Sequence, residues 1–398
     1  MKLSKRVASI QPSVTLEISA KAKALKKEGK DIVAFTAGEP DFNTPDYIIE
    51  EAKRALEEGK TKYTPTAGIP ELKKAIVKKF KEENGLDYKE SNIVVSSGAK
   101  SSLYHAICAL VDDGDEVILP SPFWLTYPEL IKLAGGTCVL VKAEIESGYK
   151  MTAKQLENAI TSKTKCVNLN SPNKPTVAVY SKEELQEIAK VIESHGLWVI
   201  ADEIYEKLDY GGEKHYSIAS FNDYMKEHTV IVNGMSKTYS MTGWRIGYIA
   251  APKAVAKAVS SMQSHTTSNA CSIAQYASVT ALTDPKGEEF IVEMQQIFDK
   301  RRKFMYEILS GIEGIKCFEP KGAFYVFVDV SGLYGKTFDG QVINGSLSFA
   351  DCALKKGVAL IPGVAFGDDN CIRLSYAISM DDIKEGLERL KNFITELK

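Results

Sequence analysis

Short apolar runs rich in β-branched residues alternate with amphipathic stretches between about residue 93 and residue 234. The runs include NIVVSSG, DEVILP, TCVLVKA and LWVIADEIY, and the stretches between them include KSSLYHAICALVDDG and SKEELQEIAKVIESHG. Strand-sized runs separated by helix-sized stretches are typical of βαβ units. The pattern therefore predicts an α/β fold with a mostly parallel sheet flanked by helices.

One of the amphipathic stretches carries clear start and stop signals for a helix. Ser181 followed three residues later by Glu184 is a capping box, in which each side chain bonds to the backbone of the other residue. Gly196 directly follows the last turn of the apolar pattern and is the residue type that most often ends a helix. We expect a helix between these positions.

The pattern changes after Pro285. A single long helical stretch, EEFIVEMQQIFDKRRKFMYEILSGI, is followed by the strand-like runs AFYVFVDV, GVALIPG and CIRLSYA and by a closing helix from about Asp382. This arrangement predicts a second, smaller α+β domain. The segment DIVAFTAGEPDF near the N-terminus is strand-like, and we expect it to join the sheet of that smaller domain.

The expected organisation is a large domain enclosed in the sequence by two parts of a smaller one. Residues 1–45 would form an N-terminal arm and part of the small domain, residues 46–284 the large domain that binds the cofactor, and residues 285–398 the small C-terminal domain. Neither a repeat nor a flexible Gly/Ser linker separates the two, so they should pack closely.

Composition narrows the classes of partner. The chain has 398 residues, of which 44% are hydrophobic and 26% charged, as in ordinary globular proteins. Fifty Lys and Arg against 52 Asp and Glu leave a net charge of −2, which gives no strong attraction to nucleic acid or membrane surfaces. Small molecules or a second copy of the chain are the expected partners.

Cysteine usage and the start of the chain indicate a cytoplasmic protein. The seven cysteines are scattered and form no Cys-x-x-Cys pair, which argues against a disulfide framework and against a zinc site. The first residues are polar and interrupted by Pro12, unlike a secretory signal. No run approaches the roughly 20 apolar residues that span a bilayer.

Residues suited to cofactor chemistry follow the predicted strands. In α/β sheets, ligands bind beyond the carboxyl ends of the strands. The turn in VVSSGAKSS opens a helix, so the amides of Gly98, Ala99 and Lys100 could bind a phosphate, although a glycine in such a turn often serves only tight geometry. Asp202 ends the buried run LWVIAD, where a carboxylate needs a partner; a helix cap or a structural ion pair would also explain it.

Lys237 and Arg245 complete a set that matches one cofactor. Lys237 follows the run TVIVNG and offers an amine able to form an imine, and Arg245 offers a guanidinium suited to phosphate. Pyridoxal phosphate requires a Schiff-base lysine, an acid beside its pyridine nitrogen and an anchored phosphate. Any one of these residues could be structural, but together they favour a pyridoxal phosphate enzyme.

The chain resembles the class I, fold-type I aminotransferases that depend on pyridoxal phosphate, and among them the bacterial and archaeal-type aspartate aminotransferases. The resemblance covers the whole length, through LSKRV, TAGEPDFNTP, KYTPTAGIPELKKAI, SGAKSSLY, DEVILPSPFWLTYPE, ADEIYEKL, SKTYSMTGWRIGY, GAFYVF and IRLSYA in the family's order. It implies the fold-type I transferase fold and an aminotransferase that moves the amino group of L-aspartate to 2-oxoglutarate through a Schiff base.

The resemblance also implies roles at the cofactor. Lys237 would form the Schiff base, Asp202 would pair with the pyridine nitrogen, and Tyr205 would donate to the phenolic oxygen, although Tyr205 alone could be a core residue. Gly98, Ala99, Ser236 and Arg245 would hold the phosphate. Tyr63 would reach the phosphate bound by a neighbouring subunit, which implies a homodimer with shared active sites.

Other matched positions would contact the substrate. Trp124 resembles the aromatic residue that stacks on the pyridine ring, Arg373 the arginine that binds the α-carboxylate, and Gly38 the backbone that closes over it. Lys100 would lie beside the cofactor and meet the side-chain carboxylate of an acidic substrate. A lysine at a helix start is otherwise disfavoured by the helix dipole.

One segment departs from the family's Asn-Asn-Pro-Thr-Gly pattern. In SPNKPTVAVY, Lys174 stands where an asparagine normally donates to the phenolic oxygen, and Val177 stands in place of the glycine. Lys174 could supply the same hydrogen bond to cofactor and substrate with added positive charge, which would lower the pKa of the imine. Because valine does not readily adopt a positive φ, we expect the loop to differ locally at Val177.

Three alternatives to aspartate transamination remain open. An aromatic or prephenate-type aminotransferase would use the same residues with another substrate. A pyridoxal phosphate lyase or decarboxylase of the same fold would break another bond. A non-catalytic cofactor-binding regulator would need an attached basic DNA-binding module, for which the sequence leaves no residues.

Overall fold

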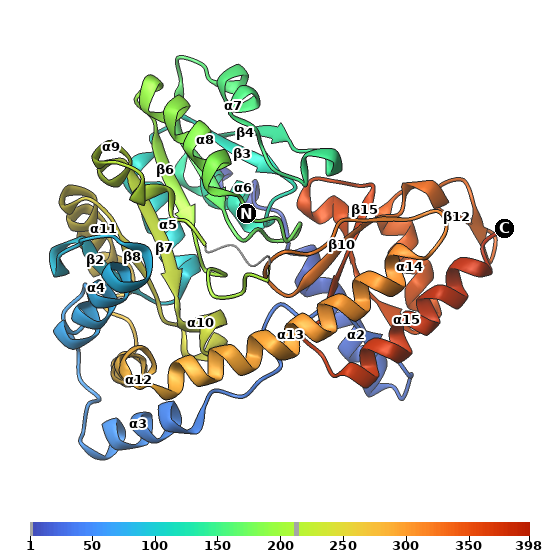
Figure 1. The fold of residues 1–398 in the computed structure, drawn as a ribbon, viewed down its shortest axis with the longest axis horizontal. Helices are drawn as coiled ribbons and strands as arrows, with labels where there is room; N and C mark the ends of the chain where they lie inside the picture. The colour runs from blue at the N-terminus through green and yellow to red at the C-terminus, as the bar shows by residue number, and fades with distance from the viewer. Residues whose placement is uncertain (1–2, 211–214) are drawn as a thin grey trace.

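The protein has two lobes joined by a long helix, α13 (Lys286–Ser310). The structure is a computed structural model that describes residues 3–210 and 215–398. Figure 1 shows α13 running from the larger lobe to the smaller one, with the C-terminus at the far end of the smaller lobe. The long helix predicted after Pro285 is confirmed.

The larger lobe is built on a mostly parallel sheet, as predicted. Within residues 3–210 and 215–398, this larger sheet has seven strands in the order β2-β8-β7-β6-β5-β3-β4. Strand β8 runs in the direction opposite to the other six strands, which are parallel to one another. The strands are β2 (Ile93–Ser96), β3 (Glu116–Ser121), β4 (Thr137–Lys142), β5 (Thr164–Asn170), β6 (Trp198–Asp202), β7 (Thr229–Gly234) and β8 (Gly247–Ala250).

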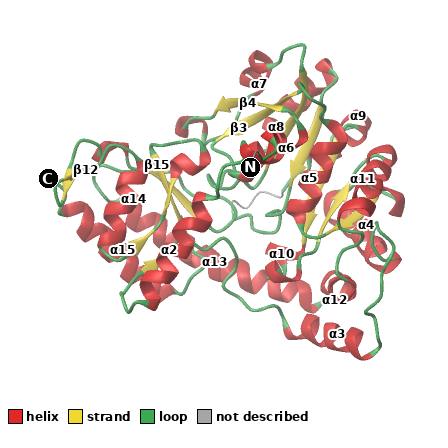
Figure 2. Cartoon of the chain, turned by 180° about the vertical axis from the view of Figure 1, so that it is seen from behind, coloured by secondary structure: helices red, strands yellow, loops and turns green. Residues whose placement is uncertain are grey.

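Helices cover both faces of the larger sheet (Figure 2). One face packs against α5 (Ala99–Leu110), α6 (Thr126–Ala134) and α11 (Lys253–Thr266) through a buried apolar cluster. The other face packs against α7 (Ala153–Ala159), α8 (Lys182–His195) and α9 (Asp223–Glu227). The end of the sheet at β2 and β8 packs against α3 (Asp46–Glu57), α4 (Pro70–Asn84) and α12 (Ser272–Thr283). Strands enclosed in this way explain the continuous apolar runs in the sequence.

The smaller lobe contains a shorter antiparallel sheet packed against α13 and two further helices. Its strands, in the order β14-β15-β10-β9, share an apolar core with these helices. The elements of this lobe are β9 (Lys316–Cys317), β10 (Tyr325–Asp329), β11 (Thr337–Phe338), β12 (Gln341–Val342), α14 (Ser346–Lys355), β13 (Val358–Ala359), β14 (Ile361–Pro362), β15 (Cys371–Ser375) and α15 (Met380–Thr395).

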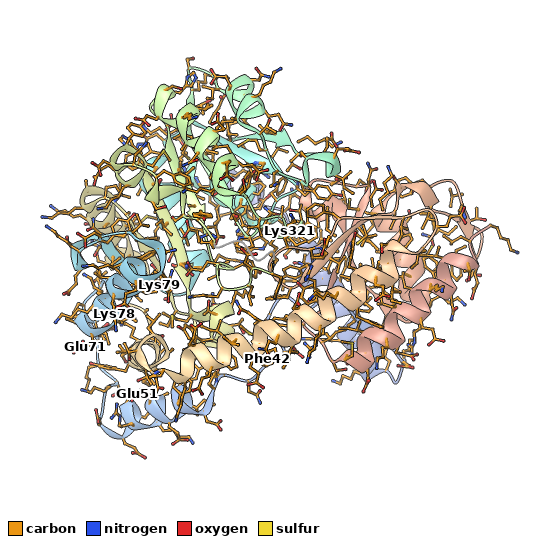
Figure 3. The ribbon with its side chains drawn as sticks, in the orientation of Figure 1. Phe42, Glu51, Glu71, Lys78, Lys79 and Lys321 are labelled. Atoms are coloured by element: carbon orange, nitrogen blue, oxygen red, sulfur yellow. The ribbon has the colours of Figure 1, made fainter. Side chains whose placement is uncertain are left out.

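The N-terminal segment joins the smaller lobe, but not through its main sheet. Strand β1 (Val33–Ala34) pairs in parallel with β13 and forms a separate two-stranded sheet. The next residues connect the lobes, since Phe42 packs edge-on against Phe290 and Phe298 of α13, beside which it is labelled in Figure 3. The predicted association is therefore correct, whereas the predicted shared sheet is not.

Shorter elements complete the fold. Helices α1 (Lys5–Ala8) and α2 (Val14–Lys27) precede β1, and α10 (Met235–Thr238) follows β7. Single 3-10 turns occur at Glu90–Asn92, Ile145–Ser147, Ile218–Ser220, Thr242–Trp244, Ser331–Leu333 and Gly363–Phe366. None of the helices described is long and apolar enough to cross a membrane.

The predicted signals of α8 are present. Ser181 Oγ accepts from Glu184 N at 3.2 Å, and Glu184 Oε2 accepts from Ser181 N at 2.8 Å. Gly196 follows the helix with a φ of 67°, in the left-handed region that glycine favours. The capping box and the glycine stop are therefore confirmed.

Candidate active site

A cavity of about 710 Å³ lies beyond the carboxyl ends of β5 and β6 and beside α10. Residues of α5 and α6, which flank the larger sheet, and residues of the N-terminal segment line this cavity. Most of the predicted site residues are among them: Gly38, Ala99, Lys100, Trp124, Lys174, Asp202, Tyr205, Ser236, Lys237 and Arg245. The strand order explains this convergence, because parallel strands bring their carboxyl ends to one edge of the sheet.

Asp202 is a buried carboxylate held in a fixed orientation. It is the last residue of β6 and is 3% exposed. Tyr127 donates from its hydroxyl to Asp202 Oδ2 at 2.7 Å, and Ile204 N donates to Oδ1 at 3.2 Å. Burial raises the pKa of Asp202 to about 6, although these hydrogen bonds oppose the shift. The carboxylate is thus suited to pairing with a cation that enters the cavity.

Lys237 presents an amine of lowered basicity to the same cavity. It lies in α10, immediately after β7, and its Nζ donates to the backbone oxygen of Gly38 at 2.6 Å. Burial lowers the pKa of Lys237 to about 8; Glu39 opposes this, and the positive charges of Arg245 and Arg373 add to it. A larger fraction of the amine is therefore uncharged and nucleophilic near neutral pH.

The start of α5 forms a cradle for an anion. Gly98 precedes the helix with a φ of 85°, and a Cβ added there would lie 2.3 Å from Nη2 of Arg245. A Cβ on Gly247 would lie 2.1 Å from the amide nitrogen of Ala99. The guanidinium therefore lies against a glycine-lined helix N-terminus, where backbone amides and the helix dipole favour phosphate. Ser236 lines the cavity nearby.

Lys100 and Lys174 converge on the same aromatic ring. Their ammonium nitrogens lie 5.1 and 5.6 Å from the centroid of Trp124, and Lys174 also lies 5.3 Å from that of Tyr325. Burial lowers the pKa of both lysines; Arg245 adds to this for Lys100, and Arg373 adds to it for Lys174. In the described residues neither ammonium has a carboxylate within ion-pair distance, so both are available to an anionic ligand.

Arg373 lies one layer behind the cavity wall. It is 1% exposed, with its guanidinium 4.5 Å from the centroid of Tyr325 and Nη2 donating to Thr36 O at 3.2 Å. Its Nε has no hydrogen-bond partner in residues 3–210 and 215–398. Tyr205 lies close by, with its hydroxyl 3.1 Å from that of Tyr325. An arginine buried without a full set of acceptors is a candidate binder of carboxylate.

Tyr63 is not part of the cavity wall of its own chain. It lies in the connection between α3 and α4 and is 90% exposed. Gly98 also lies behind the wall, covered by Arg245. The other predicted residues are brought together, whereas a role for Tyr63 would require a second subunit.

The prediction for Val177 is wrong. Val177 adopts a φ of 61°, in the left-handed region that a valine is expected to avoid. Its amide donates to Asn173 O at 3.1 Å, and its carbonyl accepts from the amides of Lys321 and Gly322 at 3.2 and 3.0 Å. The side chain is fully buried. These contacts impose the strained conformation despite the β-branched side chain.

Sequence reasoning missed several residues that shape the site. Tyr127 fixes Asp202, and Asn170 donates to the backbone oxygen of Asp202 at 2.9 Å while accepting from Lys174 N. Asn170 ends a buried strand, so the rule that singled out Asp202 could have found it. Lys23 and Lys26 of α2 also line the cavity, and no local signal indicated this.

The residues present fit pyridoxal phosphate. The cavity offers a lysine amine, a buried carboxylate, and an arginine at a glycine-lined helix start, which match the aldehyde, the pyridine nitrogen and the phosphate. Trp124 offers an aromatic face for the ring. The excess of cations over carboxylates in the wall agrees with an anionic cofactor and anionic substrates.

Comparisons with known proteins agree with this site. The family described as aminotransferase class I and II matches residues 30–390. The chain is 47% identical to the aspartate aminotransferase of Geobacillus stearothermophilus and 46% identical to a probable aspartate/prephenate aminotransferase of Aquifex aeolicus, with 99% of both chains covered in each case. It superposes on the Thermus thermophilus aspartate aminotransferase with maleate at a TM-score of 0.93 and 41% identity, covering 99% of this chain and 100% of that one.

Proposed function

The chain belongs to the aminotransferases of class I and II, and from this premise and the geometry of its cavity we propose that it transfers the amino group of L-aspartate to 2-oxoglutarate. Pyridoxal phosphate is the proposed cofactor, and oxaloacetate and L-glutamate are the products. When bound, the cofactor supplies an aldehyde that takes the amino group and a ring that withdraws electrons from the substrate α-carbon.

The observation that carries the proposal is the set of cations around the cavity. In the described part of the chain, Lys100, Lys174, Lys237, Arg245 and Arg373 each lack a carboxylate within ion-pair distance. Several cations around one cavity, without counter-ions of their own, favour the binding of anions. A phosphate, a phenolate and the two carboxylates of a dicarboxylic amino acid would supply the missing negative charges.

Lys237 and Asp202 are the proposed catalytic residues, together with Tyr205. Lys237 Nζ would hold the cofactor through its aldehyde and, as a free amine, would take the proton from the substrate α-carbon. Asp202, which Tyr127 orients by donating to its Oδ2, would keep the pyridine nitrogen protonated. Tyr205 would donate a hydrogen bond from its hydroxyl to the phenolic oxygen.

The remaining cofactor contacts follow from the same cavity wall. Arg245 and Ser236 bind the phosphate, with the amides at Gly98 and Ala99. Lys174 is proposed to donate to the phenolic oxygen, and Trp124 to stack on the ring.

Substrate recognition uses the other cations. Arg373 binds the α-carboxylate, beneath the backbone of Gly38, and Lys100 binds the side-chain carboxylate. Trp124 and Lys174 also border the space left for the substrate. Two cationic positions for two carboxylates favour an acidic substrate over an apolar one.

We propose that the protein acts as a homodimer in the cytoplasm. Tyr63 is the exposed aromatic residue that would reach the phosphate bound by the other subunit. The cytoplasmic location is supported by the seven cysteines, all of them free.

The experiment combines a covalent readout with a product readout. The purified protein is incubated with pyridoxal phosphate and reduced with borohydride, and the modified peptide is identified by mass spectrometry; the adduct is expected on Lys237. Aspartate with 2-oxoglutarate should then give oxaloacetate and glutamate in equal amounts. Lys237→Ala should lose both signals, whereas Lys253→Ala, at an exposed position of α11, should keep both.

A second acceptor is favoured by one observation. The Aquifex aeolicus relative is named for prephenate as well as aspartate, and prephenate is a dicarboxylate that could use the same cations. Replacing 2-oxoglutarate by prephenate or by an aromatic keto acid separates these substrates. Pyruvate formed from the amino donor without an equal amount of glutamate would instead identify a lyase.

A further inference from the structure

The backbone that carries Asp202 is anchored by buried charges on the side of the sheet away from Tyr127. Asp202 and Glu203 point to opposite faces, because side chains alternate along a strand and Glu203 N continues the ladder to Val232 O at 2.9 Å. Glu203 is 3% exposed and Glu206, one turn later, is 8% exposed. Two carboxylates are thus buried next to the acid proposed to bind the cofactor.

The charge of Glu206 is compensated mainly by groups other than His215. Its oxygens accept from Asn233 Nδ2 at 2.7 Å and from Asn84 Nδ2 at 3.2 Å, and it forms an ion pair with Lys79, which comes from α4 and is labelled in Figure 3. Lys79 is itself 7% exposed. Lys79 is thus the main compensating charge, and His215 adds to it, since both lower the pKa of Glu206 against the effect of burial.

Among the described residues, a single basic group, His215, lies within ion-pair distance of Glu203. Glu203 Oε2 lies 3.3 Å from Nε2 of His215, whose side chain is 8% exposed. Neither atom has a hydrogen-bond partner in residues 3–210 and 215–398. Other titratable groups that face this cluster are Glu83, Tyr88, Lys207, Tyr239 and Tyr248.

The protonation state of His215 therefore determines whether Glu203 carries an uncompensated negative charge next to Asp202. Burial lowers the pKa of His215, but its contact with Glu203 and the charge of Glu206 outweigh burial, so the net shift is upward. When His215 is protonated, it neutralises Glu203. When it is neutral or absent, the Glu203 carboxylate favours the uncharged form of Asp202, since like charges disfavour ionisation.

We propose that His215 is a positioning residue that neutralises Glu203 and so keeps Asp202 ionised and able to pair with the pyridine nitrogen of the cofactor. The inference rests on the proposed function for the identity of that cofactor. His215 acts through Glu203 and Asp202 and touches no reacting atom. The pair thus couples the cofactor site to a proton held on the opposite face of the sheet.

Cofactor binding measured against pH tests the proposal. The dissociation constant of pyridoxal phosphate is determined between pH 5.5 and 8.5 for the wild type, His215→Gln, Glu203→Gln and the double variant. His215→Gln should bind about threefold more weakly at pH 6.5, as expected for an upward shift of about one unit in the pKa of Asp202. It should match the wild type at pH 8.5, where Asp202 is ionised in both.

The double variant separates charge balance from mere support of the fold. Glu203→Gln removes the charge that His215 neutralises, so the double variant should regain the wild-type dissociation constant at pH 6.5. A merely structural pair would instead leave the double variant as weak as either single variant or weaker. Arg302→Gln, which breaks the ion pair between the buried Arg302 and the half-buried Asp299 in α13, is the control and should lower the unfolding temperature without moving the pH dependence.

Each result decides the question. The proposal would be overturned if the ratio of the dissociation constants of His215→Gln and the wild type stayed the same across pH. It would also be overturned if the double variant did not regain the wild-type dissociation constant at pH 6.5. If His215→Gln does not fold, the double variant must fold and bind like the wild type for the proposal to stand. Product formation by the wild type is scored separately, so the proposed function can hold while the role of His215 fails.

Discussion

Asp202 is a carboxylate whose position favours ligand binding over stability. It has no ion-pair partner among residues 3–210 and 215–398, and burial raises its pKa from 3.8 to about 6. In the protein without cofactor, its proton is bound more tightly in the folded state than in the unfolded state. The stability from this group is therefore fully present below pH 3.8 and is lost as the pH rises to about 6.

Replacing Asp202 by asparagine should stabilise the cofactor-free protein. Asparagine keeps an oxygen to accept from Tyr127 but carries no charge and loses the acceptor for Ile204 N, so we expect Asp202→Asn to gain about 1–2 kcal/mol at pH 7.5 and less than about 0.5 kcal/mol at pH 4. Urea unfolding of the two cofactor-free proteins at both pH values measures this. An Asp202→Asn protein less stable than the wild type at pH 7.5 would contradict the account, and its affinity for pyridoxal phosphate should fall in any case.

Lys174 leads to a second prediction at the residue scale. Its ammonium lies between the rings of Trp124 and Tyr325, and a Cβ on Gly38 would lie 3.8 Å from its Nζ. A positive charge there disfavours a proton on the nearby Schiff base. Lys174→Asn should therefore raise the pKa at which the absorbance of the bound cofactor changes, by about one unit. An unchanged pKa in a spectrophotometric titration would reject this role.

Individual residues also show the limits of sequence reasoning. Lys237 and Asp202 could be predicted because each lies at or just after the end of a buried strand, where an uncompensated charge is costly. Val177 could not, because the propensity of valine opposes a positive φ, while long-range bonds to Lys321 and Gly322 determine the conformation. A pattern that is local in sequence contains no information about such contacts.

Helix α8 is an element whose ends were predictable and whose stability can be tested. Ser181 caps its first turn and Glu184 completes the box, with Lys150 Nζ bonded to Glu184 Oε2 at 2.7 Å. Ser181→Ala should cost about 1 kcal/mol, because it leaves an amide of the first turn without its acceptor.

A serine in the same helix provides the control. Ser194 is exposed and donates only to Val191 O, so Ser194→Ala should change stability by less than about 0.5 kcal/mol. Hydrogen exchange of the amides of α8 and the urea midpoint measure both variants. Equal effects of the two substitutions would show that the capping box adds nothing to this helix.

Other elements could be placed only from the structure. Helix α2 buries a single residue, Ala22, so its sequence shows no strong apolar face, yet its residues line the cavity. The pairing of β1 with β13 joins segments more than 300 residues apart in the sequence. Strand ends and helix caps are local properties, whereas the packing of a weakly amphipathic helix depends on the whole chain.

At the scale of the molecule, the exposed aromatic ring of Tyr63 is the feature that a single chain leaves unexplained. A tyrosine that is 90% exposed gains little from burial in its own subunit. If it completes the phosphate site of a partner, each active site combines Lys237 of one subunit with Tyr63 of the other. Shared sites of this kind can be separated genetically, because the two residues then belong to different chains.

Mixing two defective proteins tests this arrangement. Lys237→Ala should be inactive, and Tyr63→Ala should bind pyridoxal phosphate weakly. When equal amounts are unfolded and refolded together at a low cofactor concentration, the mixed dimers should contain one site with both native residues. Random pairing places such a site in half of the dimers, so about a quarter of the wild-type activity should return. Activity no higher than the sum of the two proteins refolded separately would mean that Tyr63 serves its own subunit or none, since a site within one chain cannot be repaired by exchange.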